Sequence, residues 1–126
     1  MTIQEAARPV FDKQDQLDKI VSGLLPGEVV LAVYDGIGTG TGFIGLTDKR
    51  VIVQDNSFVG KQVAVTSVPY SRVSSVSVVS NKSMMGSFFS TSMIAIHAAG
   101  QTYQVQFRGD EKAHHAHQVI LHYITQ

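Results

Sequence analysis

Apolar and polar residues alternate over most of the chain, as they do in β-strands that bury one face. Two such runs flank Asp48 and Lys49, where a tight reversal is the shortest connection, so residues 42–54 are predicted to form a β-hairpin. Pro69 cannot donate a backbone hydrogen bond and indicates a corner before a new strand from Val73. The pattern therefore predicts an antiparallel β meander. Its strands are expected at residues 29–34, in both arms of the hairpin, and at residues 61–68, 73–79, 91–98 and 102–108.

Helical patterns precede and follow this meander. Apolar residues between about 9 and 25 fall on one stripe, with Pro9 in the first turn and Gly23 near the end. A second stripe at about residues 110–125 predicts a C-terminal amphipathic helix with Asp110 as its N-cap. We expect both helices to pack on the sheet, with partner binding by the first helix as the alternative. The stripes consist of Val10, Leu17, Ile20, Val21 and Leu24, and of Ala116, Val119, Ile120, Tyr123 and Ile124.

Composition narrows the class of protein. With 126 residues, 44% of them hydrophobic, the chain can form one core, and we predict a single domain over residues 1–126. Ten basic and ten acidic residues leave no net charge, so nucleic acid is not an expected partner. The absence of cysteine excludes disulfides, zinc-thiolate sites and thiol catalysis. Residues 1–14 lack the features of a secretory signal, and no apolar stretch approaches about 20 residues, so a soluble cytoplasmic protein is expected.

Motifs for enzyme chemistry are not found in the sequence. The glycine-rich segment 35–42 lacks the third glycine of a dinucleotide-binding loop at the required spacing, and a strand follows it where that loop needs a helix. We interpret this segment as a hairpin connection. The serines of residues 71–92 follow the period of a strand's outer face, and no flanking motif marks one of them as a nucleophile. We therefore predict no enzyme activity and no cofactor.

Histidines crowd the predicted C-terminal helix. His114, His117 and His122 make a surface metal site geometrically possible. Carboxylates that could complete it are scarce, because only Asp110 and Glu111 are close in sequence. We expect a solvated polar face without a metal, and a pH-sensitive contact is the alternative.

An apolar segment interrupts the polar connection expected between two strands at residues 81–90. It carries Met84, Met85, Phe88 and Phe89 around one glycine. If these side chains are exposed, they form a patch that a partner or a bilayer would cover. If they fold over the end of the sheet, they belong to the core. The sequence leaves both interpretations open.

Several short sequence motifs resemble those of the bacterial PH-domain families, including the families described as YokE-like. The resemblance rests on Leu46-Thr47-Asp48-Lys49-Arg50-Val51-Ile52, on Gly60-Lys61, on Val68-Pro69-Tyr70, and on Leu25-Pro26-Gly27-Glu28 before the first strand. It covers about residues 24–124. The resemblance implies a pleckstrin-homology-like barrel or sandwich of about seven antiparallel strands, closed by the C-terminal helix, with the N-terminal helix added. It also implies a frequent homo-oligomer built through sheet edges, and no defined activity.

The best-known PH domains bind phosphoinositides through basic residues in the loop that joins their first two strands. Here that loop is segment 35–42, which contains no base and one acid, so phosphoinositide binding is not expected. We predict a non-catalytic interaction or scaffold module that self-associates or binds another protein. Its interface would use strand edges or Met84, Met85, Phe88 and Phe89. The alternative is a peripheral membrane or lipid-binding module that inserts the same four residues, with Lys82 as the neighbouring cation.

Overall fold

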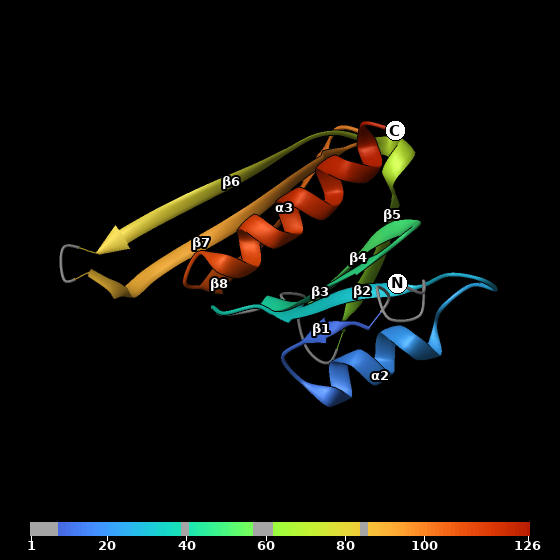
Figure 1. Cartoon of the computed structure of the whole chain (residues 1–126), viewed down its shortest axis with the longest axis horizontal. Helices are drawn as coiled ribbons and strands as arrows, with labels where there is room; N and C mark the ends of the chain where they lie inside the picture. Colours follow the sequence, from blue (N-terminus) through green and yellow to red (C-terminus); the bar gives the residue numbers. More distant parts are fainter. Residues whose placement is uncertain (1–7, 39–40, 57–61, 84–85) are drawn as a thin grey trace.

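Figure 1 shows the computed structural model, which describes residues 8–38, 41–56, 62–83 and 86–126, without the side chains of residues 41 and 81–89. Within these ranges the chain forms two β-sheets and two α-helices. The helices are α2 (Gln14–Ser22) and α3 (Glu111–Ile124), and a short 3-10 helix, η1 (Tyr70–Arg72), joins the sheets. The strands are β1 (Val10–Phe11), β2 (Val30–Asp35), β3 (Thr41–Thr47), β4 (Arg50–Asp55), β5 (Ala64–Pro69), β6 (Val73–Ser83), β7 (Gly86–Ala98) and β8 (Gln101–Arg108).

The strands form a sandwich. Sheet A has the order β1-β2-β3-β4-β5, and sheet B has the order β6-β7-β8. All neighbouring strands are antiparallel except β1, which runs parallel to β2. At one corner β5 ends at Pro69 and η1 leads into β6, as the proline predicts. At another corner, the Ile37 N–H donates to the Gln106 carbonyl at 2.8 Å. The predicted PH-like sandwich is confirmed, with two separate sheets rather than a closed barrel.

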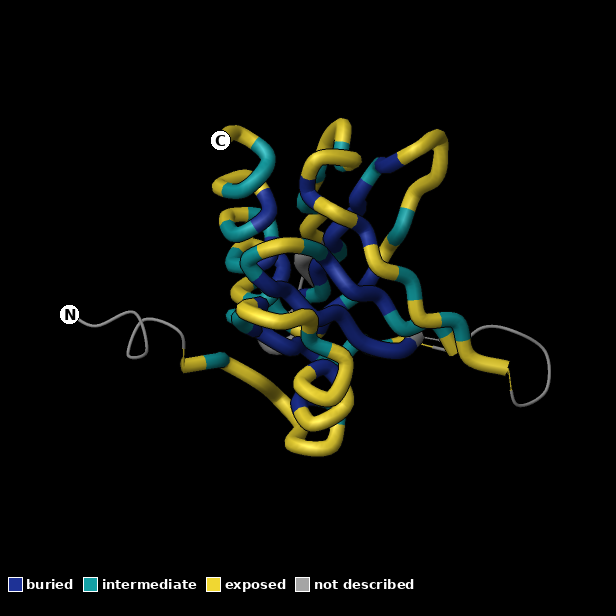
Figure 2. Tube along the Cα trace, turned by 90° about the vertical axis from the view of Figure 1, so that its right-hand side faces the viewer, coloured by how far each residue is buried: buried dark blue, intermediate teal, exposed yellow. Residues whose placement is uncertain are grey.

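The main core lies where the inner faces of the two sheets meet α3. Its completely buried side chains include Ile44, Leu46, Ile94, Phe107 and Ile120. Figure 2 shows these buried segments gathered in the middle of the molecule. The helix α3 therefore closes the sandwich, as its apolar stripe predicts.

A second, smaller core lies between α2 and the outer face of sheet A. Leu17 and Ile20 of the helix pack there against Val33, Phe43 and Ile52. The helix approaches β3 closely because position 45 is glycine, and a Cβ atom there would stand 2.6 Å from Ile20 Cδ1. The N-terminal helix thus packs on its own sheet, as expected.

Three local predictions need correction. The N-terminal helix begins at Gln14 rather than near Pro9, because Val10 and Phe11 pair with β2 as an extra strand. The segment 81–90 is not a loop over its described part, since β6 continues to Ser83 and β7 begins at Gly86. Asp110 occupies the N-cap position of α3, but its side chain makes no capping hydrogen bond.

Candidate interaction surfaces

A buried ion pair holds the β3–β4 hairpin to the segment before β2. Arg50 Nε donates to Glu28 Oε2 at 2.8 Å, and Arg50 Nη2 donates to Glu28 Oε1 at 2.9 Å. The Glu28 carboxylate, whose side chain is completely buried, also accepts from the Thr47 hydroxyl at 2.7 Å and from the Leu25 N–H at 2.8 Å. The Arg50 hydrogen bond lowers the pKa of Glu28 to about 2, against the opposing effect of burial. A carboxylate so fully bonded stabilises the fold and is unsuited to acid–base catalysis.

The Pro-Tyr corner holds the same end of the β3–β4 hairpin. Tyr70 donates its buried hydroxyl to the Thr47 carbonyl at 2.6 Å, and its ring stacks on Tyr123 of α3 at 4.9 Å. Burial raises the pKa of Tyr70. Asp48 caps the start of β2, because its Oδ1 accepts from the Val29 N–H at 2.9 Å. Gly60-Lys61 lies outside the described residues, and the other sequence pieces that carry the PH-domain resemblance are structural residues that join the hairpin, the corner and α3.

The histidines of α3 do not form a metal centre in the part of the chain that the structure describes. No three His, Asp or Glu side chains there are grouped so that they could hold a metal ion. His114 is exposed, and His122 is exposed beside the ring of Tyr123, 4.8 Å between centroids. His117 is half-buried on the same helix. As surface groups they fit the predicted polar face.

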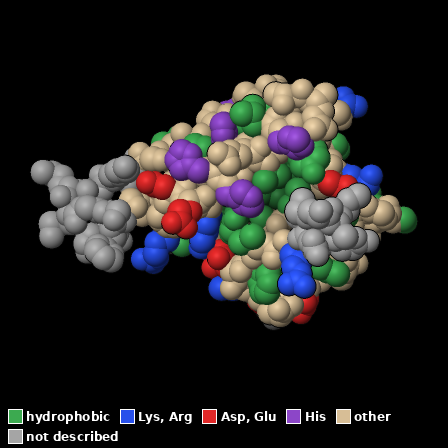
Figure 3. All heavy atoms as spheres, viewed as in Figure 1, with side chains coloured by type: hydrophobic (Ala, Val, Ile, Leu, Met, Phe, Trp, Pro, Cys, Tyr) green, Lys and Arg blue, Asp and Glu red, His purple; other side chains and the backbone are tan. Residues whose placement is uncertain are grey.

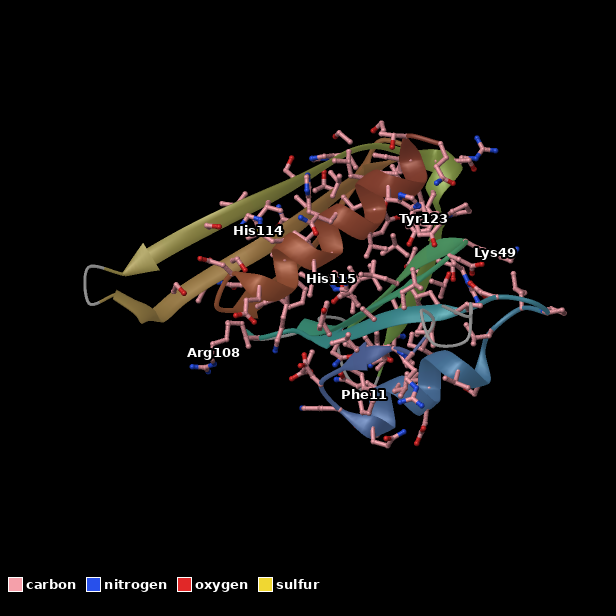
Figure 4. All side chains as sticks on the ribbon, in the orientation of Figure 1. Phe11, Lys49, Arg108, His114, His115 and Tyr123 are labelled. Carbon is pink, nitrogen blue, oxygen red and sulfur yellow. The ribbon has the colours of Figure 1, made fainter. Side chains whose placement is uncertain are left out.

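His115 differs from the other histidines of α3, although the sequence pattern did not distinguish it from them. Its Nδ1 shares a hydrogen bond of 2.6 Å with the Tyr34 hydroxyl of β2, and Figure 4 shows it between α3 and sheet A. Burial raises the pKa of Tyr34. Lys112 adds an ion pair to Asp12 at 3.0 Å on the same side of α3. These contacts fasten α3 to sheet A, and no local signal reveals them because 81 residues separate Tyr34 from His115.

We expect Tyr34→Phe to lower the free energy of unfolding by about 1 kcal/mol, because the variant leaves a half-buried imidazole nitrogen without its partner. Urea unfolding followed by circular dichroism measures this change. Tyr103→Phe is the matched control, since the Tyr103 hydroxyl makes only an exposed contact of 3.4 Å with Gln101. Equal effects of the two substitutions would show that the bond to His115 contributes nothing.

A shallow groove runs between α3 and β2 beside this contact. Its volume is about 260 Å³, and Leu31, Val119 and Tyr123 supply its apolar lining. Figure 3 shows histidine side chains gathered next to hydrophobic ones over this face. His115, His122 and Gln118 supply its polar lining, which contains no carboxylate.

The glycine-rich segment 35–42 is tied to α2 through its one acid. Asp35, its one acid, accepts from Gln16 Nε2 at 2.7 Å and pairs with Lys13 at 3.3 Å. The segment leads into β3, a strand, as predicted. A polar cavity of about 450 Å³ lies beside it, and there the buried Gln16 Oε1 has no hydrogen-bond partner among the described residues. Residues 39–40 lie outside the description.

Of the four predicted interaction residues, Phe88 and Phe89 belong to β7. Met84 and Met85 fall outside the described residues, and so do the side chains of Phe88 and Phe89. Whether these side chains are core or interface stays a prediction. The described part of the hairpin projects beyond α3 at the left of Figure 1.

Sheet B presents an outer face on which Arg108, at the end of β8, is the only charged side chain among those that the structure describes. Lys82 is the one Lys, Arg, Asp or Glu among residues 73–107. Both helices pack elsewhere, α3 against the inner face and α2 against sheet A. The rows across this outer face are Ser75–His97–Thr102, Ser77–Ala95–Gln104 and Val79–Met93–Gln106. The sequence signal for this surface is the charge-poor run of residues 73–107. The alternation of apolar and polar residues alone does not reveal it.

The edge of sheet B is open along β6. This strand pairs with β7 only, and no backbone hydrogen bond within the described ranges reaches its other side. Val79 is 41% exposed on it. Edge strands of soluble proteins usually carry charges or proline that prevent pairing, but residues 73–81 contain neither. The free edge and the charge-poor face together make sheet B the candidate interaction surface.

The two sheets and the C-terminal helix define the class of the protein as a pleckstrin-homology-like sandwich. A family profile described as "Bacterial PH domain" matches residues 2–124, and the chain belongs to this family. A pleckstrin homology domain from Shewanella amazonensis SB2B is similar, with a TM-score of 0.65 and 20% identity over 91% of this chain and 100% of that one. A DUF1696 family protein with a pleckstrin-homology domain from Shewanella loihica PV-4 has a TM-score of 0.59 and 17% identity, over 90% and 94%. No curated protein matches the chain.

PH domains are generally non-catalytic modules that bind proteins or lipids. Over the described residues, neither helix is long and apolar enough to cross a membrane.

Proposed function

We propose that this chain is a non-catalytic interaction module that self-associates through sheet B. The observation that carries the proposal is the free edge of β6, which has no charged residue from Val73 to Asn81. A second copy can satisfy the outward N–H and C=O groups of this edge by pairing its own β6 in antiparallel orientation. Such a pair is related by a two-fold axis and joins two three-stranded sheets into one.

The outer face of sheet B supports the same proposal. Burying serine, threonine, glutamine, valine and methionine costs less than burying ionised groups, which would need partners in the interface. The one lysine of residues 73–107 does not amount to the basic cluster that binding to an anionic membrane generally needs. A protein surface is therefore favoured over a lipid surface. We include Met84, Met85, Phe88 and Phe89 in the proposed interface because they belong to the same hairpin.

The test is the solution mass over a wide concentration range, by size-exclusion chromatography with light scattering. The wild-type chain is expected at a multiple of its 13.7 kDa. The double variant Ser77→Lys, Val79→Lys places lysines on the edge strand of both copies, where they would repel each other, so we expect it to be monomeric. Both residues are exposed, so the folded state should be retained, as a thermal melt would check.

Val21→Lys is the matched control, because Val21 is 48% exposed on α2, which packs on sheet A. It should leave the mass unchanged. A wild-type monomer at every concentration would reject self-association, and an assembly that survives the double variant would reject sheet B as its interface. A monomer that sediments with anionic phospholipid vesicles would favour the membrane alternative.

A further inference from the structure

A second groove lies on sheet A, on the opposite side of the sandwich from the proposed interface. The helix α2 covers β2, β3 and β4 but leaves the outer face of β5 open. Between α2 and β5 runs a groove of about 230 Å³, and its apolar lining is Ile20, Phe43, Ile52 and Val65. This volume is of the size that one or two apolar side chains fill.

The strand β5 that borders this groove is the open edge of sheet A. It pairs with β4 from Arg50↔Pro69 to Asp55↔Ala64, and no backbone hydrogen bond in the described ranges reaches its far side. Val65 is 54% exposed on its outer face, and Val63, just before the strand, is 48% exposed. An open edge beside an apolar groove is the arrangement that an added strand requires, since the edge binds its backbone and the groove selects a side chain.

The charges around the groove indicate what kind of strand fits. Lys19 lies at its rim, and the described partner of Lys19 Nζ is the neutral Gln54 side chain. The three ion pairs in the described part of the chain do not include Lys19. Arg50, at the other end, is already neutralised by Glu28. The groove thus offers one cation without a carboxylate beside an apolar floor.

We propose that an extended peptide segment of another protein binds here, adds to β5 as a sixth strand of sheet A, places an apolar side chain in the groove and pairs a carboxylate with Lys19. A second copy of this chain fits less well, because its β5 brings no carboxylate between Gln62 and Pro69. The proposal goes beyond self-association, since it uses the other sheet and a different partner.

The experiment selects ligands from a random ten-residue peptide library displayed on phage, with the full-length protein as the target. Selected peptides are synthesised with a fluorescein label, and their affinity is measured by fluorescence polarisation. We expect sequences that alternate apolar and polar residues and that contain one Asp or Glu. Val65→Lys should weaken their binding at least tenfold, because it places a charge at the groove. Lys19→Glu should weaken it about fivefold, and replacing the peptide's acid by lysine should restore it.

Val79→Lys is the matched control, since it makes the same substitution at an exposed valine of sheet B. It should leave peptide affinity unchanged even if it alters self-association, which separates this proposal from the preceding one. A selection without convergent alternating sequences would overturn the proposal, and so would peptides whose affinity is the same for Val65→Lys and the wild type. If Val65→Lys instead converts an assembled wild type to a monomer, the occupant of the groove is a second copy and the proposal is wrong.

Discussion

Replacing Glu28 by Gln is expected to remove most of the stability of this domain. The Glu28 side chain is completely buried and accepts hydrogen bonds from Arg50, Thr47 and the Leu25 N–H. The neutral amide leaves the largely buried guanidinium of Arg50 without its counter-charge. In addition, the NH₂ group of glutamine is a hydrogen-bond donor and replaces a carboxylate oxygen that accepted hydrogen bonds. Breaking one partner of a buried ion pair costs about 3–5 kcal/mol, which is a large part of the total for a domain of this size. Urea unfolding measures the loss.

The pH dependence of the same variant checks the cause. The pKa of Glu28 is lowered to about 2 from its ordinary 4.5, so its ionised form stabilises the folded state. That contribution is complete above about pH 4.5 and is lost as the pH falls toward 2. The difference in stability between the wild type and Glu28→Gln should therefore shrink over this acid range.

Glu111→Gln serves as the control for this prediction. Glu111 is an exposed acid in the first turn of α3, so the substitution should change stability by only about 0.5 kcal/mol. A Glu28→Gln variant with near wild-type stability, or with a stability difference that does not vary between pH 5 and 2, would contradict the role given to the ion pair.

Gly42→Ala is expected to cause the second largest loss, about 3 kcal/mol. A Cβ atom at this position would stand 2.1 Å from the Gln54 carbonyl oxygen and 2.8 Å from its carbon. These atoms belong to the backbone of β4, where the β3–β4 register shifts between Thr41 and Phe43, and they cannot move without disturbing the ladder. The midpoint of thermal or urea unfolding measures the effect.

The matched control is Gly23→Ala at the end of α2. A Cβ atom there would lie at an ordinary 3.8 Å from the nearest neighbour, the Ile20 carbonyl oxygen. Its φ of −104° is open to any residue, so we expect a change within about 0.5 kcal/mol. If the two alanine variants unfold at the same midpoint, steric contact at Gly42 is not what constrains that position.

Alternation identified most strands because it follows directly from which face of a strand is buried. It failed at Val10 and Phe11, which lie next to Pro9 and fit a helical stripe as well as a strand, and pairing with β2 decides between the two. It also stopped early in the β6–β7 hairpin, where consecutive apolar residues blur the period. Backbone hydrogen bonding between β6 and β7 nevertheless continues to the pair Ser83–Gly86, because it does not depend on alternation of the side chains.

The contacts between residues far apart in the sequence could not be predicted from local sequence patterns. Glu28 and Arg50 are 22 residues apart and meet only through the register of β2 with β3 and of β3 with β4. The PH-domain resemblance singled out both residues without giving their roles. The candidate interface on sheet B was visible in part, as a stretch without charge. That the stretch forms both an open edge and a complete outer face depends on strand order, which one sequence does not determine.

The distribution of charge on the molecule has a consequence for its behaviour in solution. All formal charges except that of Lys82 belong to residues before Val73 or after Phe107, so the strands of sheet B carry only Lys82 and Arg108. An assembly formed through sheet B would contain almost no ion pairs for salt to screen. Its mass should therefore be nearly independent of ionic strength, whereas binding of an acidic peptide at Lys19 should weaken as salt is added.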